Sequence, residues 1–423
     1  MLQRIINKSR AVEFIAGNKM LKMITFIPKI RFKKFLNHWS YTELKEAKDV
    51  RDGTHSSPKY INNGYPLVTS KNLTDSGLNL NDVSLISESD YKEINKRSKV
   101  EVGDILLGLI GTIGKPVLVE TDGFAIKNVG LIKNGGQIQN QFLLQYLKTN
   151  LFNKYIQIEM AGNTQKFLGL ETLRNTKVPV PSQDEQSAIG SLFRTLDDLL
   201  ASYKDNLTNY QALKGTMFSK MFPKAGQTVP EIRLNGFDAE WEIRKLSEVS
   251  EVYDGTHQTP NYTESGVKFL SVENISTLES EKYISEEDFE KDFKVFPEFG
   301  DVLMTRIGSI GVPNIVNTNE KIAFYVSLAL LKPKKKTNSL FMKSSIESNP
   351  FQEELWKKTL HIAFPKKINK NDISQSTIKC PSYEEQQAIG AYFSNLDSLI
   401  SAHQEKISQL ETLKKKLLQD MFI

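Results

Sequence analysis

The sequence predicts a mixed α+β protein in which two similar globules are joined by two long antiparallel coiled-coil helices, an internal repeat with pseudo-two-fold symmetry. Three observations predict this architecture. Sequence blocks recur in the same order at nearly constant spacing, each copy carries short β-rich runs between turn residues, and each copy closes with a long heptad-like stretch. With 423 residues the chain is also long enough for two domains, since single domains typically span about 100 to 200 residues.

Four blocks carry the repeat. In the first, Pro28, Ile30, Arg31, Phe35, Trp39 and Leu44 return at one constant offset as Pro230, Ile232, Arg233, Phe237, Trp241 and Leu246. The same offset relates two Asp-Gly-Thr-His strings, at residues 52–55 and 254–257. The other blocks are Gly-Asp followed by Ile-Gly-Thr/Ser-Ile-Gly, at 103–114 and 300–311, and the closing stretches 181–222 and 381–422. This ordered recurrence indicates a duplicated unit of about 200 residues.

The segments before each closing stretch have a mixed character. In the first copy, β-rich runs lie between turn signals at residues 66–70, 104–110, 117–120 and 177–180, and the amphipathic stretch 141–157 predicts one helix. The predicted divisions are an N-terminal extension at 1–26, globules at 27–181 and 223–381, and helices at 182–222 and 382–423. Because the repeat begins only near Ile27, we expect the functional start to lie nearer Met20 or Met23 than Met1.

A capping box opens each closing stretch. Ser182 and Ser382 each precede a glutamate by three residues, so the serine oxygen and the glutamate carboxylate are both expected to satisfy free amides at the helix start. Apolar side chains then step alternately by four and three, at Ile189, Phe193, Leu196, Leu200, Tyr203, Leu207 and Tyr210 and at Ile389, Phe393, Leu396, Ile400, His403, Ile407 and Leu410. Each seam needs a long apolar partner, and the other helix is the obvious one. Helices of about 40 residues measure roughly 60 Å, so the pair predicts a molecular ruler of about one to two turns of B-DNA.

Composition limits the classes of function. The 55 basic and 50 acidic side chains give a net charge of +5, too balanced for a histone-like binder but compatible with a locally basic nucleic-acid face. The single cysteine, Cys380, excludes an intramolecular disulfide framework and a cysteine zinc site, as is typical of the reducing cytoplasm. The histidines show no paired metal-ligand spacing, and no run of about 18 apolar residues predicts a membrane span. We therefore expect a cytoplasmic protein with no metal site and no membrane contact.

The Asp-Gly-Thr-His string places a carboxylate, a hydroxyl and an imidazole together, which suits a catalytic or base-reading loop. The alternative is a tight turn, in which the glycine takes positive φ and a later proline fixes the exit. No second histidine, cysteine or serine recurs at a repeated position that would complete a nucleophilic or metal site. We therefore favour the turn and assign no catalytic residue.

The glycine-rich loop before Lys115 resembles a phosphate-binding loop only superficially. The first glycine of that motif would fall at Leu109, Pro116 follows the lysine where Ser or Thr is required, and the second copy has Val312 in place of the lysine. A strand end or tight turn that lets a DNA backbone approach is the better interpretation, with the loop hydroxyl able to donate to DNA.

Between the blocks the copies diverge, and Lys71 in one copy stands opposite Glu273 in the other. Two readers of different short sequences would need such unlike loops on a shared frame, because base-edge contacts specify and backbone contacts position.

Together these residues resemble the specificity subunits of type I restriction-modification systems. The resemblance rests on the repeated Pro-x-Ile-Arg and Trp segment, the Asp-Gly-Thr-His and Ile-Gly-Thr/Ser-Ile-Gly blocks, and Pro-Ser-x-x-Glu-Gln-x-Ala-Ile-Gly at 181–190 and 381–390. It covers essentially everything from about residue 27 to the end.

The resemblance implies two target-recognition domains, each reading one half of a split DNA sequence, separated by helices that set the spacer and dock two modification subunits. S-adenosylmethionine, ATP and Mg²⁺ would belong to the modification and restriction subunits, so this chain would bind double-stranded DNA without a cofactor or catalysis. The residues expected to lie near DNA are Thr54, His55, Lys71, Asn72, Thr112 and Lys166 in the first domain and Thr256, His257, Asn274, Arg306, Ser309 and Lys366 in the second. Leu109 stands where the second copy has Arg306, so a phosphate role there is not shared.

Two alternatives stay open on the sequence alone. One is a self-sufficient DNA methyltransferase or endonuclease, against which the missing glycine-rich cofactor strand counts. The other is a helical adaptor that binds only protein.

Overall fold

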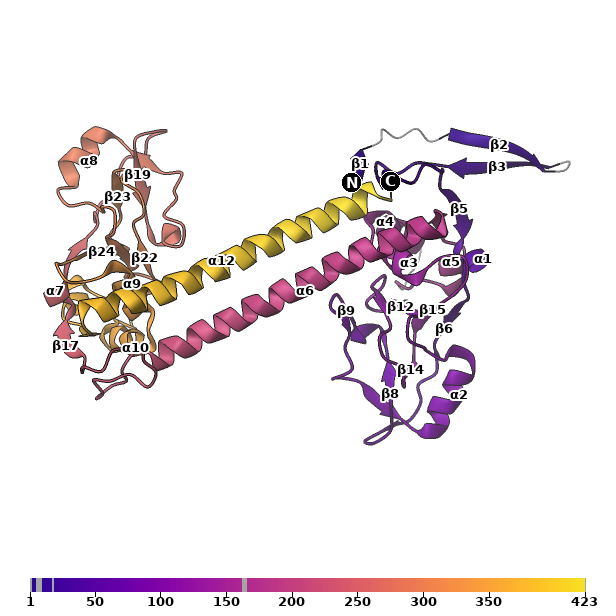
Figure 1. Ribbon diagram of the computed structural model, residues 1–423, viewed down its shortest axis with the longest axis horizontal. Helices are drawn as coiled ribbons and strands as arrows, with labels where there is room; N and C mark the ends of the chain where they lie inside the picture. Colours follow the sequence, from indigo (N-terminus) through magenta and orange to yellow (C-terminus); the bar gives the residue numbers. More distant parts are fainter. Residues whose placement is uncertain (1, 5–9, 17–18, 162–165, 423) are drawn as a thin grey trace. The chain divides into compact units, whose positions relative to one another are not determined.

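The computed structural model describes residues 2–4, 10–16, 19–161 and 166–422 (Figure 1). The chain divides into two compact units, one formed by Met1–Tyr203 with Lys406–Ile423 and the other by Lys204–Glu405. Each unit therefore holds a mixed α/β globule and one end of each of the two long helices. None of the described helices combines the length and apolarity needed to cross a membrane.

Two four-stranded sheets form the frame of the first unit. The main sheet is antiparallel and has the order β13 (Pro116–Leu118), β12 (Ile105–Gly108), β15 (Val129–Ile132) and β6 (Val50–Asp52). The second has the order β14 (Ala125–Ile126), β8 (Tyr65–Val68), β11 (Ser84–Ile86) and β7 (Tyr60–Ile61), with β14 and β8 parallel. The two-stranded pairs are β1 (Leu2–Arg4) with β4 (Ile30–Phe32), β2 (Arg10–Ala16) with β3 (Lys19–Thr25), β5 (Ser40–Glu43) with β16 (Lys177–Val180), and β9 (Leu73–Thr74) with β10 (Gly77–Leu78).

The helices of the first unit are α1 (Leu44–Ala47), η1 (Ser70–Asn72), α2 (Glu88–Ser98), α3 (Asn140–Leu147), α4 (Asn150–Met160) and α5 (Leu170–Arg174). The single helix predicted at 141–157 is wrong, because α3 ends before Thr149 and α4 begins after it. The Thr149 hydroxyl accepts a hydrogen bond from the amide of Phe152 at 3.2 Å, which makes it the N-cap of a new helix.

The second unit repeats this plan, with three strands instead of four in its second sheet. Its main sheet has the order β18 (Ser250–Asp254), β24 (Leu328–Pro333), β21 (Val302–Thr305) and β22 (Pro313–Ile315), and its second sheet β20 (Tyr283–Ile284), β19 (Val267–Leu270) and β23 (Ile322–Phe324). β17 (Glu242–Lys245) pairs with β25 (Thr377–Cys380). The helices are α7 (Leu246–Val249), η2 (Val272–Asn274), α8 (Glu286–Asp292), α9 (Ser339–Glu347), α10 (Asn349–Lys358) and α11 (Lys370–Ser374).

The long helices are α6 (Gln183–Lys220) and α12 (Tyr383–Asp420). All predicted seam positions are buried or half-buried, whereas the positions directly after them are exposed or half-buried, apart from the buried glycines Gly190 and Gly390. In the first unit, Phe193 of α6 contacts Phe422, at a ring separation of 6.5 Å, and Asp197 pairs with Lys414. Residue numbers that increase along α6 thus meet residue numbers that decrease along α12, which confirms antiparallel pairing within this unit.

The second unit pairs the same helices at their other ends. Phe218 stacks on Phe393 with ring centroids 4.3 Å apart, and the Lys214 ammonium lies 2.5 Å from Asp397. The repeat places Asp397 at the position of Asp197 and Lys414 at the position of Lys214. The two ion pairs are therefore equivalent, and both units use the same antiparallel register.

In each unit the repeated tryptophan packs against a repeated phenylalanine at the end of a long helix. Trp39 packs edge-on against Phe142 and Phe422, at 5.8 Å and 6.1 Å, and all three rings are buried. Trp241 packs in the same way against Phe341 and Phe222, both at 5.9 Å. Each globule thus completes its aromatic core with a phenylalanine from the end of the helix that follows the other globule in sequence.

The capping-box prediction is half confirmed. The Ser182 and Ser382 hydroxyls accept hydrogen bonds from the amides of Glu185 and Glu385, at 3.4 Å and 3.2 Å. The predicted hydrogen bond from a helix-start amide back to each glutamate carboxylate is wrong, because both carboxylates bind arginines instead. Glu185 accepts from Arg31 at 2.6 Å and from the indole of Trp39 at 3.0 Å, and Glu385 accepts from Arg233 at 2.6 Å. The repeated Pro-x-Ile-Arg segment is therefore tied to the start of each long helix by an ion pair, which is buried in the first unit and partly buried in the second.

Candidate nucleic-acid interface

In both units the Asp-Gly-Thr-His and Ile-Gly-Thr/Ser-Ile-Gly segments meet at one edge of the main sheet. β6 ends at Asp52 and β12 at Gly108, and both pair antiparallel with the first residues of β15, so these strand ends share an edge. We call the segments at this position the loop edge. It comprises residues 52–55, 69–72, 108–114, 127–128 and 166–168 in the first unit, and 254–257, 271–274, 305–311, 325–327 and 360–368 in the second.

Backbone contacts join these segments. Thr54 forms a parallel bridge with Lys127, and Thr256 forms the corresponding bridge with Tyr325. The amide of Leu168 donates to the carbonyl of Leu109 at 2.8 Å, and the amide of Ile368 donates to that of Arg306 at 3.0 Å. The loop edge is therefore one connected surface in each unit.

The Asp-Gly-Thr-His string does not form the predicted tight turn, and neither glycine takes positive φ. The chain instead leaves the strand extended and passes directly against its neighbour. A Cβ on Gly53 would lie 2.3 Å from the carbonyl oxygen of Ile126, and one on Gly255 would lie 2.3 Å from that of Phe324. Close backbone approach, rather than left-handed geometry, therefore requires glycine here.

The aspartate of this string organises its neighbours in the first unit. One carboxylate oxygen of Asp52 lies 2.8 Å from Nε2 of His55, and the other accepts from Arg97 at 2.5 Å. Nδ1 of His55 lies 2.9 Å from the side-chain oxygen of Asn128. The imidazole is thus oriented on both sides while its ring stays largely exposed. Such a ring suits recognition at a surface.

The second unit reaches a different arrangement. Asp254 is bound by Arg306, while Nε2 of His257 lies 3.9 Å from the carboxylate. Arg306 is buried, and its Nε also donates to the carbonyl of Ile368 at 3.1 Å. Its guanidinium therefore holds two segments of the loop edge together, and the expectation that Arg306 lies near DNA stays a prediction. Leu109 fills the same strand position in the first unit as a buried apolar residue.

The asparagines expected near DNA also bind within the fold. The Asn72 side chain accepts from the amide of Thr69 at 2.9 Å and donates to the carbonyl of Asp82 at 2.8 Å. Asn274 accepts from the amide of Ser271 at 2.9 Å and donates to the carbonyl of Glu279 at 2.7 Å. These amides therefore organise their own loops, because their hydrogen-bonding groups already have protein partners, and their position near DNA stays a prediction.

The glycine-rich loops form the predicted tight turns. Gly111 and Gly114 have φ of 78° and 76°, and Gly308 and Gly311 have φ of 82° and 81°. Open space surrounds the Cα of Gly111 and of Gly308. The hydroxyl-bearing residue between each pair of glycines, half-buried Thr112 or exposed Ser309, is thereby displayed at the loop edge.

Charge differs between the two loop edges. Lys71 is exposed and lies 3.6 Å from Asp82, whereas Glu273 in its place binds Lys282 at 2.9 Å. Lys166 is exposed in the first unit, and Lys366 in the second lies over the ring of Trp356 at 5.0 Å. Sequence reasoning missed Arg97 and Lys127, since neither recurs in the second copy and no motif contains them.

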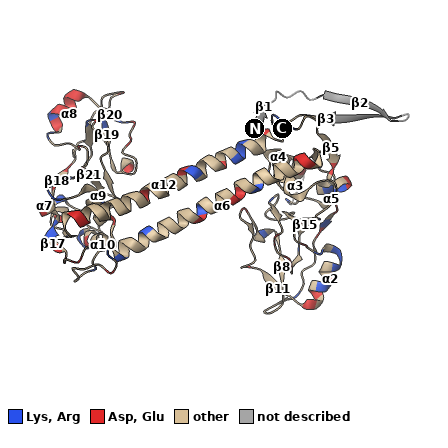
Figure 2. Ribbon diagram, viewed as in Figure 1, with Lys and Arg blue, Asp and Glu red and all other residues tan. Residues whose placement is uncertain are grey.

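The helices beside the second sheet extend this difference. The ribbon colours of Figure 2 mark mainly acidic residues on α8, and both acidic and basic residues on α2. α2 ends in Lys96 and Arg97, whereas the first turn of α8 carries three acidic residues.

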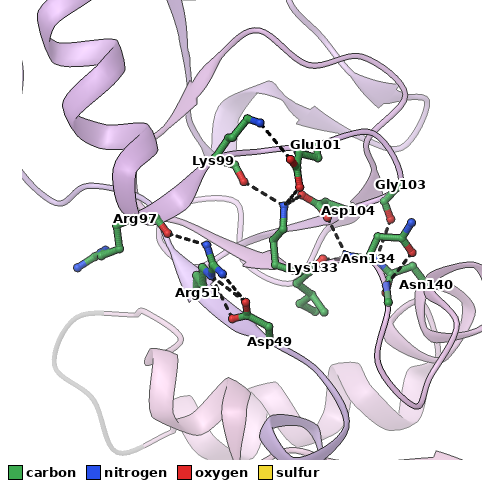
Figure 3. A network of polar contacts seen from close by, with 12 residues as sticks. Asp49, Arg51, Arg97, Lys99, Glu101, Gly103, Asp104, Lys133, Asn134 and Asn140 are labelled. Carbon is green, nitrogen blue, oxygen red and sulfur yellow. Dashed lines mark hydrogen bonds and ion pairs between the residues drawn. The ribbon is translucent and has the colours of Figure 1, made fainter.

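A second charged cluster lies at the opposite end of the main sheet, around the repeated Gly-Asp block (Figure 3). Lys133 donates to Asp104 at 2.6 Å and to Glu101 at 2.9 Å, and the bonds from Lys133 and Lys99 lower the pKa of Glu101 to about 2. Lys332 binds Asp301 at 2.6 Å in the second unit. The block is therefore a repeated structural ion pair within the frame.

Comparison with known proteins gives this geometry its context. The family model of the type I restriction modification DNA specificity domain matches residues 37–209 and 238–412. The chain is 24% identical over 433 residues to the putative type I restriction enzyme MjaX specificity subunit of Methanocaldococcus jannaschii, covering 94% of this chain and 97% of the relative. It is 22% identical over 368 residues to the MjaVIII specificity subunit of the same organism, covering 84% of each.

Solved structures show the same fold. The S subunit of a type I restriction-modification system from M. genitalium matches with a TM-score of 0.61 at 15% identity, over 94% of this chain and 99% of that one. The predicted mixed α/β fold with a repeated domain is thus confirmed. The chain belongs to the specificity subunits of type I restriction-modification systems and carries two tandem DNA-specificity domains.

Proposed function

We propose that each unit presents its loop edge to duplex DNA and reads one half of a split target sequence. The observation that carries this proposal is that one frame displays two different sets of side chains. Lys71 stands where the second unit has Glu273. Asp52 orients His55 at 2.8 Å in the first unit, whereas His257 lies 3.9 Å from Asp254 in the second. A common frame sets position while unlike side chains distinguish bases.

The long helices set the spacing between the half-sites and dock two modification subunits. Their outer faces support docking, because Leu199, Leu213, Leu399 and Leu413 are exposed at equivalent positions of the two helices. Within each helix the two leucines are two heptads apart, so they share one face outside the seam. A helical partner would cover such a stripe. S-adenosylmethionine, ATP and Mg²⁺ act on the modification and restriction subunits, and this chain supplies no catalytic group.

Methylation sequencing tests the proposal. Co-expression of the chain with its cognate modification subunit should produce adenine methylation at one bipartite motif. A chain-deleted strain that carries the same modification subunit is the matched control and should lose that methylation. An unchanged methylome in the control would contradict the proposal, as would DNA binding by the complex that does not weaken with salt.

A further inference from the structure

We propose that the loop 360–367 of the second unit is an apolar wedge that inserts Phe364 against a base step of the half-site read by this unit. The inference rests on the proposed function and adds a specific contact to it. The loop connects α10 to α11, and it is closed at its base where the amide of Leu360 donates to the carbonyl of Lys367 at 2.8 Å.

The tip of this loop is exposed to an unusual degree. Ile362 and Phe364 have relative exposures of 100% and 103%, so neither side chain packs against the protein. Complete exposure of a phenylalanine is unfavourable relative to burial, because its apolar surface stays in contact with water. A tip of this composition therefore indicates a surface that a partner covers.

The stem of the loop belongs to the loop edge. The carbonyl of Lys366 accepts from the amide of Gly308 at 2.8 Å, and Lys367 forms a bridge with Ile307. Arg306 connects the next residue, Ile368, to Asp254. The apolar tip is thus carried by the same network that holds the Asp-Gly-Thr-His segment and Ser309.

Charge favours DNA as the partner. Lys357, Lys366 and Lys367 are exposed and form no ion pair with any carboxylate in the described part of the chain, while Lys358 is neutralised by Glu354. Lys366 instead lies over Trp356. An apolar tip between unpaired lysines matches the backbone phosphates and stacked bases of a duplex, into which Phe, Ile and Pro side chains insert as wedges.

Size argues against a protein partner at this tip. A stable protein interface buries about 800 Å² on each partner, whereas one phenylalanine offers roughly 200 Å². The two tip side chains are therefore too small to form such an interface, but they match one base step.

The test uses the complete complex and the target that methylation sequencing identifies. Target duplexes carry 2-aminopurine in one half-site or the other, so that unstacking raises its fluorescence. Wild-type complex should raise the signal at one step of one half-site, and Phe364→Ala should abolish that rise and weaken specific binding roughly tenfold. Phe364→Leu should retain most of both effects, because leucine also acts as a wedge.

Phe299→Ala is the matched control. Phe299 is an exposed phenylalanine of the same unit, but it precedes β21 and lies at the end of the main sheet opposite the loop edge. It should leave both readouts unchanged.

The outcomes separate the two proposals. Loss of target methylation on deleting the chain, combined with an unaltered 2-aminopurine signal and affinity in Phe364→Ala, overturns the wedge and leaves the proposed function standing. Normal DNA binding by Phe364→Ala with loss of the modification subunit also overturns the wedge, since it assigns the tip to protein contact. A chain without any specific DNA binding overturns both.

Discussion

The guanidinium of Arg97 lies 2.5 Å from the carboxylate of Asp52, and it comes from the last turn of an 11-residue helix. The corresponding helix of the second unit has only 7 residues and supplies no arginine, and Arg306 from the end of β21 binds Asp254 instead. The two units keep the contact between carboxylate and guanidinium but take the guanidinium from different elements. The loop edge thus keeps a guanidinium bound to this aspartate in both units, whichever element supplies the arginine.

Arg306→Leu should destabilise the second unit by about 2 to 3 kcal/mol, because it leaves the partly buried Asp254 without its cation. Leucine is the matched replacement, since Leu109 occupies that strand position in the first unit. Arg97→Leu should cost less than about 1 kcal/mol, because the Arg97 side chain is largely exposed and the Asp52 carboxylate keeps His55 as a partner. Urea unfolding of the full chain measures both, and equal losses would contradict the buried structural role of Arg306.

Glu185→Gln should destabilise the first unit by about 3 kcal/mol, because Arg31 is buried and would retain an uncompensated charge. Ser182→Ala removes only the cap at the same helix start and should cost about 1 kcal/mol or less. The ranking is the prediction, measured by thermal unfolding monitored through tryptophan fluorescence. A larger loss in Ser182→Ala would restore the capping box as the dominant contact.

Leu196→Asp and Leu396→Asp should prevent folding of the helical pair, since both side chains are buried in the seam. Leu199→Asp and Leu399→Asp are exposed controls three residues away. They should leave the melting temperature within a few degrees of wild type, yet abolish co-purification with the modification subunit. If the Leu199→Asp and Leu399→Asp variants still co-purified with the modification subunit, the proposal that this face docks the subunit would be contradicted.

Insertion of one heptad after Leu207 and another after Ile407 should lengthen the methylated motif. Seven helical residues add about 10 Å, which corresponds to about three base pairs of spacer. Equal insertion preserves the seam because it adds a full heptad to both antiparallel partners. Methylation sequencing reports the spacer, and insertion in one helix alone serves as the mismatched control. A functional double insertion with the original spacer would refute the ruler.

Lys48 should make stability depend on alkaline pH. Its ammonium is buried and donates to the carbonyl of Ile138 at 2.9 Å, and burial lowers its pKa from 10.5 to about 8. Between these values the unfolded chain holds a proton that the folded chain has released, so the contribution of this site to stability rises with pH. The stability of wild type relative to Lys48→Met should therefore increase from pH 8 to 10.5 in urea unfolding.

Lys45→Met is the control for this measurement. Lys45 is exposed, and its hydrogen bond with Glu43 raises its pKa above the ordinary value, so no gain is expected in the same pH window. A relative stability of Lys48→Met that stays constant with pH would contradict the lowered pKa.

Much of the fold could be predicted from local pattern. The heptad steps from Ile189 to Tyr210 define one face of a helix, because apolar side chains at this spacing project from the same side. The paired glycines of the Ile-Gly-Thr/Ser-Ile-Gly block permit left-handed backbone, and both copies form the tight turn that was one of the two structures predicted there. The repeat itself located the segments that meet at the loop edge.

Contacts between distant residues could not be predicted in this way. Glu185 has the spacing of a capping residue, yet Arg31, which lies 154 positions earlier, takes its carboxylate. Gly53 has the signature of a turn, but the carbonyl of Ile126 makes glycine necessary. In both cases the local preference amounts to about 1 kcal/mol, which a buried ion pair or a steric clash readily exceeds.

The sequence by itself therefore determined the duplication, the two long helices and the positions of the repeated loops, because these follow from periodicity and from glycine's backbone freedom. Only the tertiary structure decided which side chains of the loop edge hold the fold and which are displayed. Asn72 and Arg306 are committed inward, while His55, Ser309 and Phe364 remain exposed. That division depends on how strands far apart in the chain bring donors and acceptors together, because buried polar groups must find hydrogen-bond partners and only the remaining side chains stay exposed.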